Sequence, residues 1–145
     1  MNPWSLVLLA PVAFALVCDL RTREVPDWIP LSIVVWACLA TAMGLHKLTW
    51  IGLMAGALLG LGLSAVVFYL GGFGGGDVKL LAAIGAAVGP GVLLSILTWM
   101  AFAGGVLAVI AAVRGKRMFA YVPAIAVGVV VETFWPGGLA RVLLR

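Results

Sequence analysis

Long apolar stretches, separated by short polar or glycine-rich segments, make up almost the whole chain. They cover approximately residues 4–18, 28–44, 50–70, 78–89, 91–113 and 118–135. Because a hydrocarbon core of about 30 Å takes around 20 helical residues, this pattern predicts six transmembrane helices. The 36 residues of 78–113 would form one helix of about 54 Å, so we expect the chain to turn at Gly89-Pro90-Gly91.

The composition agrees with a membrane protein. Of the 145 residues, 65% are hydrophobic and 10% are charged, and the mean hydropathy is +1.25, whereas a soluble domain has about 45–50% apolar residues. Six spans leave almost nothing for a soluble domain, so residues 1–145 are expected to form one all-α polytopic domain, a six-helix transmembrane bundle. The first 18 residues lack a basic segment, so we expect them to remain as the first span.

The basic residues lie in short loops and predict the orientation. They account for a formal net charge of +4, but their scatter argues against a nucleic-acid partner and favours contact with anionic lipid. Six crossings would place on one side Arg21, Arg23, Lys79, Arg114, Lys116 and Arg117, and on the other side Lys47, Arg141 and Arg145. The positive-inside rule then places the first side in the cytoplasm and the N-terminus outside.

Metal and redox chemistry find little support in the sequence. Cys18 and Cys38 are 20 residues apart and no CxxC pair occurs, which argues against a zinc site or a redox centre. We expect both cysteines to be packing residues, and we expect no metal or cofactor. The single histidine, His46, falls on the side opposite to the cytoplasmic loops.

Two carboxylates interrupt this apolar chain. Asp19 ends the first apolar stretch, and Asp77 follows the run Gly71-Gly72-Phe73-Gly74-Gly75-Gly76. A charged side chain at bilayer depth costs about 2.5 kcal/mol or more, so such residues are usually functional. At 1.5 Å per residue, the stretches 4–18 and 78–89 cover only about 22 Å and about 18 Å, which would leave both carboxylates below the cytoplasmic interface beside water.

The glycine run before Asp77 predicts a break in the helix, because each glycine costs about 1 kcal/mol relative to alanine. A loop formed by Gly74, Gly75 and Gly76 could admit an extended peptide beside Asp77. Each acid also has a simpler explanation. Asp77 could be the N-cap of the next helix behind a flexible loop, and Asp19 could mark the end of the first span. The presence of both acids on one side of a small bundle favours a shared site.

Two carboxylates that share a site cannot both ionise easily, so one stays protonated near neutral pH. This is the arrangement of aspartic proteases, in which the ionised acid takes a proton from the attacking water and the protonated acid donates to the developing oxyanion. Asp77 at a helix N-terminus is favoured as the anion, and Asp19 near a helix C-terminus is disfavoured as one. The pattern therefore favours Asp77 as the starting base.

At these residues the chain resembles the type IV prepilin peptidases, particularly the small form associated with Flp-type, tight-adherence pili. The first aspartate of that family resembles Asp19 in Asp19-Leu20-Arg21-Thr22-Arg23-Glu24-Val25-Pro26. Its G-x-G-D-V-K motif resembles Gly74-Gly75-Gly76-Asp77-Val78-Lys79, and its late apolar proline segment resembles Tyr121-Val122-Pro123-Ala124. The resemblance extends in layout from about residue 19 to residue 135.

The resemblance implies a function. It implies an aspartic endopeptidase of the bacterial cytoplasmic membrane that removes the short basic leader from pilin-like precursors at the cytoplasmic face, with Asp19 and Asp77 as the catalytic pair. Larger relatives also N-methylate the new amino terminus and carry paired CxxC motifs in an added segment. This chain has neither that segment nor a CxxC motif, so methyltransferase activity is not expected.

Further charged residues lie close to these motifs. Asp27 stands where the family usually has Asn, and we interpret it as an N-cap of the second span rather than a catalytic or leader-binding acid. Glu24 is expected to be a solvated loop charge, with contact to a basic leader as the alternative. Lys79 could pair with a carboxylate or contact the substrate, and Glu132 has no assigned role.

Small residues recur at four-residue spacing on two of the predicted spans. They are Gly52, Gly56, Gly60 and Ser64 in the third span, and Ala120, Ala124 and Gly128 in the sixth. Such stripes let helix backbones approach closely, which is how helices associate in lipid. We expect them to be packing surfaces without chemistry.

Two functions from other classes remain open at this point. A small transporter or proton-relay protein could use Asp19 and Asp77 to carry ions, but it would need polar groups reaching both faces of the membrane. A noncatalytic assembly scaffold would account for the small-residue stripes but leaves the paired acids without a purpose. The clustering of the acids on one side favours the peptidase.

Overall fold

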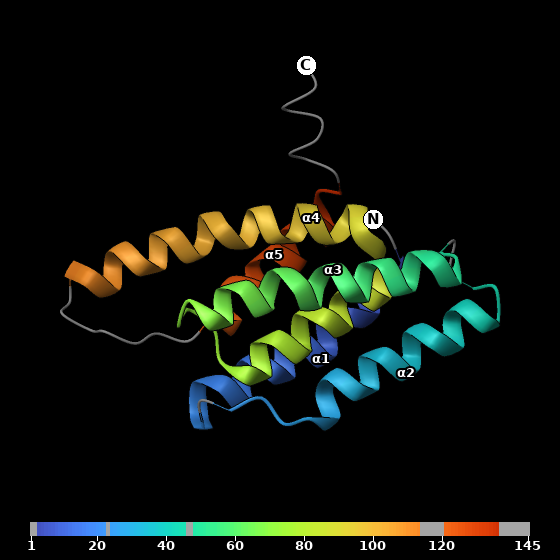
Figure 1. Cartoon of the computed structure of the whole chain (residues 1–145), viewed down its shortest axis with the longest axis horizontal. Coiled ribbons are helices and arrows are strands. Elements are labelled where there is room, and N and C mark those ends of the chain that lie inside the picture. The colour runs from blue at the N-terminus through green and yellow to red at the C-terminus, as the bar shows by residue number, and fades with distance from the viewer. Residues whose placement is uncertain (1–2, 23, 46–47, 114–120, 137–145) are drawn as a thin grey trace, which may run out of the picture. The chain divides into compact units, whose positions relative to one another are not determined.

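The computed structural model describes residues 3–22, 24–45, 48–113 and 121–136. These residues form five helices and no strand (Figure 1): α1 (Pro3–Thr22), α2 (Trp28–Ala42), α3 (Trp50–Tyr69), α4 (Gly75–Val113) and α5 (Val122–Phe134). The expected all-α class is confirmed. Several residues named above lie outside the described residues, namely Arg23, His46, Lys47, Arg114, Lys116, Arg117, Ala120, Arg141 and Arg145.

The six apolar stretches correspond to five helices because two of them lie within α4. Inside α4, Gly89 has φ 79° and ψ 170°, which is not a helical conformation. A Cβ built on Gly85 would lie 3.0 Å from Leu93 Cδ2, although eight residues of a straight helix span about 12 Å. The chain therefore bends sharply at Gly89, and the predicted turn is confirmed. Glycine suits this position because other residues rarely adopt a positive φ.

Two compact units divide the chain. One comprises Met1–Arg23 and Leu94–Arg145, and so contains α1, the second part of α4 and α5. The other comprises Glu24–Leu93, and so contains α2, α3 and the first part of α4.

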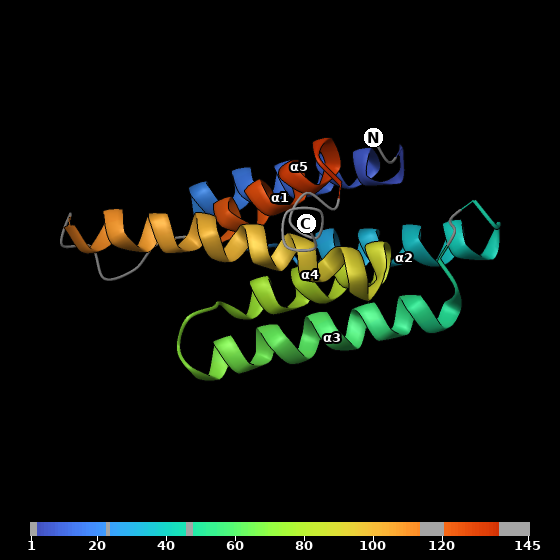
Figure 2. The same ribbon diagram turned by 90° about the horizontal axis from the view of Figure 1, so that it is seen from above.

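In the unit Glu24–Leu93, α3 packs closely against the first part of α4 (Figure 2). A Cβ on Gly60 would lie 2.5 Å from the carbonyl oxygen of Leu81 and 3.2 Å from Ala82 Cα. The carbonyl groups of Gly56 and Gly85 would likewise overlap a Cβ placed on the opposite glycine. The small-residue stripe predicted on this span is therefore a helix-packing surface, as expected from lipid-embedded helices.

In the other unit, α1 packs against α5. Leu8, Val12 and Ala15 are buried at the three- and four-residue spacing of one helical face. On α5, a Cβ on Gly128 would lie 2.6 Å from the carbonyl oxygen of Ile96, so α5 also lies close to the second part of α4. Gly128 therefore has the predicted packing role.

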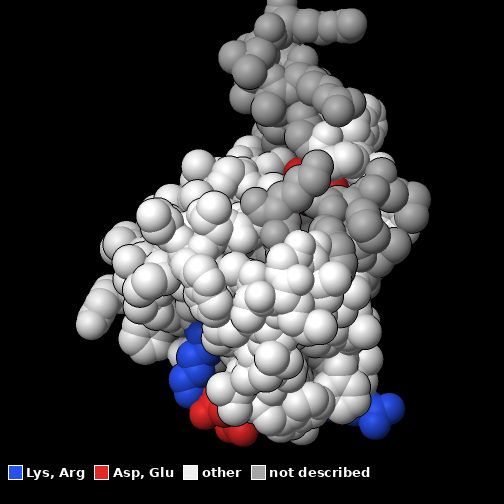
Figure 3. Space-filling view, turned by 90° about the vertical axis from the view of Figure 1, so that its right-hand side faces the viewer, with Lys and Arg blue, Asp and Glu red and all other residues white. Residues whose placement is uncertain are grey.

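The surface of these helices is largely apolar. On α3, Ile51 is 81% exposed, and Met54 and Leu58 are also exposed. Among the described residues, most of the face shown in Figure 3 is uncharged. Among the described residues, two helical segments are long and apolar enough to cross a membrane, Trp50–Tyr69 and Gly75–Leu107, the second including the bend at Gly89. These features belong to a helical membrane protein; the full set of six crossings stays a prediction.

Candidate active site

The link between α3 and α4 positions Asp77. Helix α3 ends at Tyr69, Gly71 has φ 78°, and α4 begins at Gly75. Gly75 and Gly76 therefore belong to the first turn of the helix, and the prediction that they form a loop with Gly74 is wrong. The carbonyl of Gly74 already accepts hydrogen bonds from the backbone N–H groups of Asp77 (3.1 Å) and Val78 (3.4 Å), which closes the first turn despite its glycines.

The side chain of Asp77 completes this turn. Its Oδ2 accepts a hydrogen bond from the backbone N–H of Gly74 at 3.0 Å. Gly74 is thus the N-cap residue, and Asp77 is the third residue of the helix, whose side chain reaches back to it as in a capping box. The simpler explanation of Asp77 as the N-cap residue itself is therefore wrong. Asp77 is 8% exposed, and a helix N-terminus stabilises a carboxylate held there.

The segment just before α2 lies against the same turn. A Cβ built on Gly76 would lie 3.0 Å from Val25 Cβ and 3.4 Å from Val25 N. Gly76 immediately precedes Asp77, so Val25 packs beside the turn that carries the carboxylate. The absence of a side chain at position 76 allows this approach.

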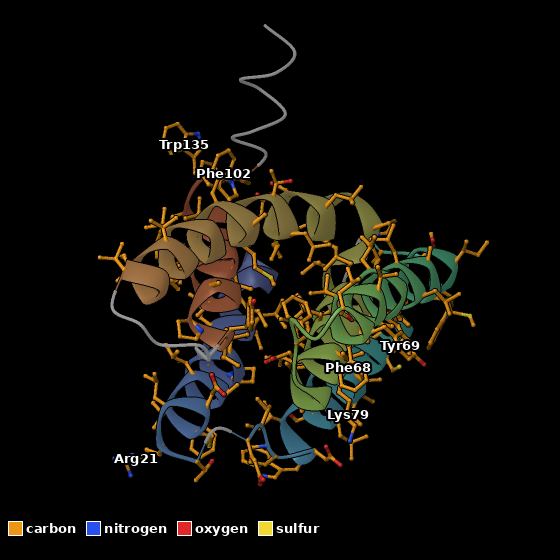
Figure 4. The ribbon with its side chains drawn as sticks, turned by 60° about the vertical axis from the view of Figure 1, so that its left-hand side comes forward. Arg21, Phe68, Tyr69, Lys79, Phe102 and Trp135 are labelled. Carbon is orange, nitrogen blue, oxygen red and sulfur yellow. The ribbon has the colours of Figure 1, made fainter. Side chains whose placement is uncertain are left out.

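Asp27 and Lys79 form an ion pair next to this contact. Lys79 Nζ lies 2.7 Å from Asp27 Oδ1, and the two side chains are 56% and 74% exposed. Figure 4 labels Lys79 on α4. Asp27 occupies the N-cap position of α2, as predicted, but its side chain makes no capping hydrogen bond. That part of the prediction is wrong, because the carboxylate is directed to Lys79 instead. Glu24 is exposed.

Asp19 lies in the last turn of α1, which continues to Thr22 beyond the predicted end at residue 18. The side chain of Asp19 is only 7% exposed, so it is not a solvated charge at a helix end. Asp19 and Asp77 belong to different units, and their pairing stays a prediction.

A third buried carboxylate is Glu132, to which the sequence assigns no role. Glu132 on α5 is 6% exposed and accepts a hydrogen bond from the hydroxyl of Ser95 on α4. A signal for this contact was present, because Ser95 lies six residues after Gly89 and Glu132 lies near the end of the last apolar stretch. The predicted topology places both near the same membrane face. A buried carboxylate needs such a donor.

The described residues contain no group of three or more His, Cys, Asp or Glu side chains that could hold a metal ion. Cys18 and Cys38 are free thiols.

Comparison with known proteins gives one match. A model of the type IV leader peptidase family matches residues 6–109. Searches of curated proteins and of solved structures found no match. The matched region begins in α1 and ends within α4, so it contains Asp19, Gly74 and Asp77 and leaves out α5.

Proposed function

The chain belongs to the type IV leader peptidase family, and we propose that it is a membrane-embedded aspartic endopeptidase in which Asp19 and Asp77 form the catalytic pair. Its substrates are pilin-like precursors, from which it removes the short basic leader at the cytoplasmic face of a bacterial cytoplasmic membrane. The distribution of basic residues supports this orientation. The Flp-type identity of the substrate rests on the resemblance of the motifs around the two acids.

The observation that carries the proposal is the burial of both carboxylates inside an apolar helical chain. Asp19 and Asp77 are 7% and 8% exposed, and both fall within the region matched by the family. Buried acids in a membrane protein are costly and are retained for function. Asp77 is in addition fixed by the N–H of Gly74, which gives a general base a defined position.

The positions of the acids on their helices support different roles. Asp77 in the first turn of α4 is favoured as the anion, and Asp19 in the last turn of α1 is favoured in the protonated form. Asp77 would accept a proton from water as the water oxygen attacks the peptide carbonyl, and Asp19 would donate its proton to the carbonyl oxygen. Collapse of the tetrahedral intermediate then breaks the C–N bond, the amine nitrogen takes a proton from Asp77, and Asp19 recovers its own from the hydroxyl oxygen.

The first turn of α4 also provides space for a peptide. A Cβ on Gly75 would meet no atom within 4 Å, and one on Gly74 would meet only Asp77 Oδ2. An extended substrate could therefore approach the backbone here without meeting a side chain. We propose that the scissile peptide lies along Gly74 and Gly75.

The test is cleavage of a pilin-like precursor by the full chain reconstituted in lipid vesicles. Asp19→Asn and Asp77→Asn should each lower the rate by about 10² to 10⁴, because each removes one member of the acid–base pair. Glu132→Gln is the matched control, since Glu132 is also a buried carboxylate but lies outside the proposed pair. It should retain cleavage. Cleavage that survives either aspartate substitution would contradict the proposal, and ion flux across the vesicles without cleavage would favour a transporter.

A further inference from the structure

The first turn of α4 has low helix propensity, yet it carries Asp77, whose carboxylate must be held in a fixed position for the proposed reaction. Its first two residues are Gly75 and Gly76, and glycine has the lowest helix propensity of all residues except proline. The local hydrogen bond from Gly74 N–H holds the carboxylate of Asp77 to its own turn. That bond alone does not hold the turn against the rest of the protein.

The segment before α2 supplies that support, and its two contacts join residues 51 and 52 positions apart in the sequence. Val25 packs on Gly76, and Asp27 binds Lys79 at 2.7 Å. These two contacts lie on either side of Asp77 along the chain, one residue before it and two residues after it. The segment 25–27 therefore spans the turn that carries the carboxylate.

The side chain of Asp27 binds Lys79 and does not cap α2. It stands at the N-cap position of α2 with φ −61° and ψ −22°, and its carboxylate makes no capping hydrogen bond. Aspartate is among the best N-cap residues, yet here the carboxylate accepts from Lys79 Nζ instead. The start of α2 is left to backbone bonds, from Ile29 N–H to Pro26 and from Leu31 N–H to Asp27.

We propose that Asp27 and Lys79 are positioning residues for Asp77, and that their ion pair clamps the segment 25–27 onto the first turn of α4. This inference rests on the proposed function, because it assigns a role in the cleavage reaction to residues that do not touch the reacting atoms. Opening the clamp lets the turn shift and takes the carboxylate of Asp77 out of line with the water and the peptide. Small displacements of catalytic groups are costly because catalysis depends on their alignment.

The experiment is a double-mutant cycle on precursor cleavage by the full chain in lipid vesicles. Asp27→Asn and Lys79→Gln should each lower kcat by about two- to fivefold with KM unchanged, the range expected from the strength of exposed ion pairs. The double variant should be no slower than either single variant, because both remove the same contact. Lys79→Arg keeps the positive charge that pairs with Asp27 and should retain the kcat of the wild-type protein. Lys47→Gln is the charge-matched control, since the sequence predicts Lys47 on the side of the membrane opposite to Lys79, and it should leave kcat unchanged.

A salt series gives an independent readout. Because exposed charges are screened by salt, kcat of the wild-type protein should fall toward that of the single variants as the ionic strength rises, and kcat of the variants should stay flat. Multiplying effects in the double variant, or a rise in KM without a change in kcat, would overturn the clamp and make the two residues substrate contacts or unrelated sites. These outcomes require cleavage by the wild-type protein, so they are distinct from a failure of the proposed function, in which the wild-type protein does not cleave.

Discussion

Replacing Gly60 with alanine should separate α3 from α4. The added Cβ would lie 2.5 Å from the carbonyl oxygen of Leu81, 3.1 Å from its carbonyl carbon and 3.2 Å from Ala82 Cα. All three are backbone atoms of a helix, so none can rotate away as the end of a side chain could. Ordinary contacts begin at 3.4 Å, and the helices must therefore move apart locally by about 0.9 Å, the difference between 3.4 and 2.5 Å.

The cost follows from this gap. A radial separation of 0.5–1 Å forfeits about a quarter to a half of the dispersion energy of each affected contact. Helix association in lipid relies on such contacts because hydrophobic burial contributes little there. Overpacking of this kind lowers the free energy of unfolding by about 1–3 kcal/mol, and we expect Gly60→Ala toward the upper end because the three nearest atoms all belong to the backbone.

Gly62→Ala is a matched control two residues along the same helix. A Cβ on Gly62 would meet no atom within 4 Å, while both substitutions change helix propensity equally. Unfolding of both variants in mixed detergent micelles, followed by far-UV circular dichroism, should place Gly60→Ala about 2–3 kcal/mol below Gly62→Ala. Equal stability of the two variants would refute the close approach of α3 and α4 at Gly60.

Two further substitutions test other contacts by the same measurement. Gly76→Ala brings a Cβ to 3.0 Å from Val25 Cβ and should lower the free energy of unfolding by about 1 kcal/mol relative to Gly62→Ala. A free energy of unfolding equal to that of Gly62→Ala would contradict the packing of Val25 on α4. Ser95→Ala removes a hydrogen-bond donor from the buried carboxylate of Glu132 and should cost about 1–3 kcal/mol, whereas a stability equal to that of the wild-type protein would show that this bond contributes nothing.

Much of the helical layout could be predicted from the sequence because it depends on local properties. Helix α3 was expected at 50–70 and occupies Trp50–Tyr69, since the length of a continuous apolar run and the residues flanking it are visible in the chain. The break at Gly89 was predicted for a similar reason. A helix much longer than a bilayer must bend, and glycine is the residue that permits a positive φ.

The details of the candidate site were less predictable because they depend on competing partners. A sequence shows that Asp27 can cap a helix, but not that Lys79, 52 residues later, takes its carboxylate instead. Likewise, the glycines at 75 and 76 indicate a loop by propensity, whereas the bonds made by Gly74 and Asp77 draw them into the helix. The pairing of Asp19 with Asp77 stays a prediction.

The hydrogen bond between Gly74 and Asp77 has a consequence for the catalytic cycle. A bond from an N–H to a charged carboxylate is about twice as strong as one to a neutral acceptor. In the proposed mechanism Asp77 becomes neutral each time it takes the proton of water. Its hydrogen bond with the N–H of Gly74 therefore weakens during every turnover and recovers when the proton leaves. The first turn of α4 would thus be held less firmly while the tetrahedral intermediate is present, and more firmly again once Asp77 has lost its proton.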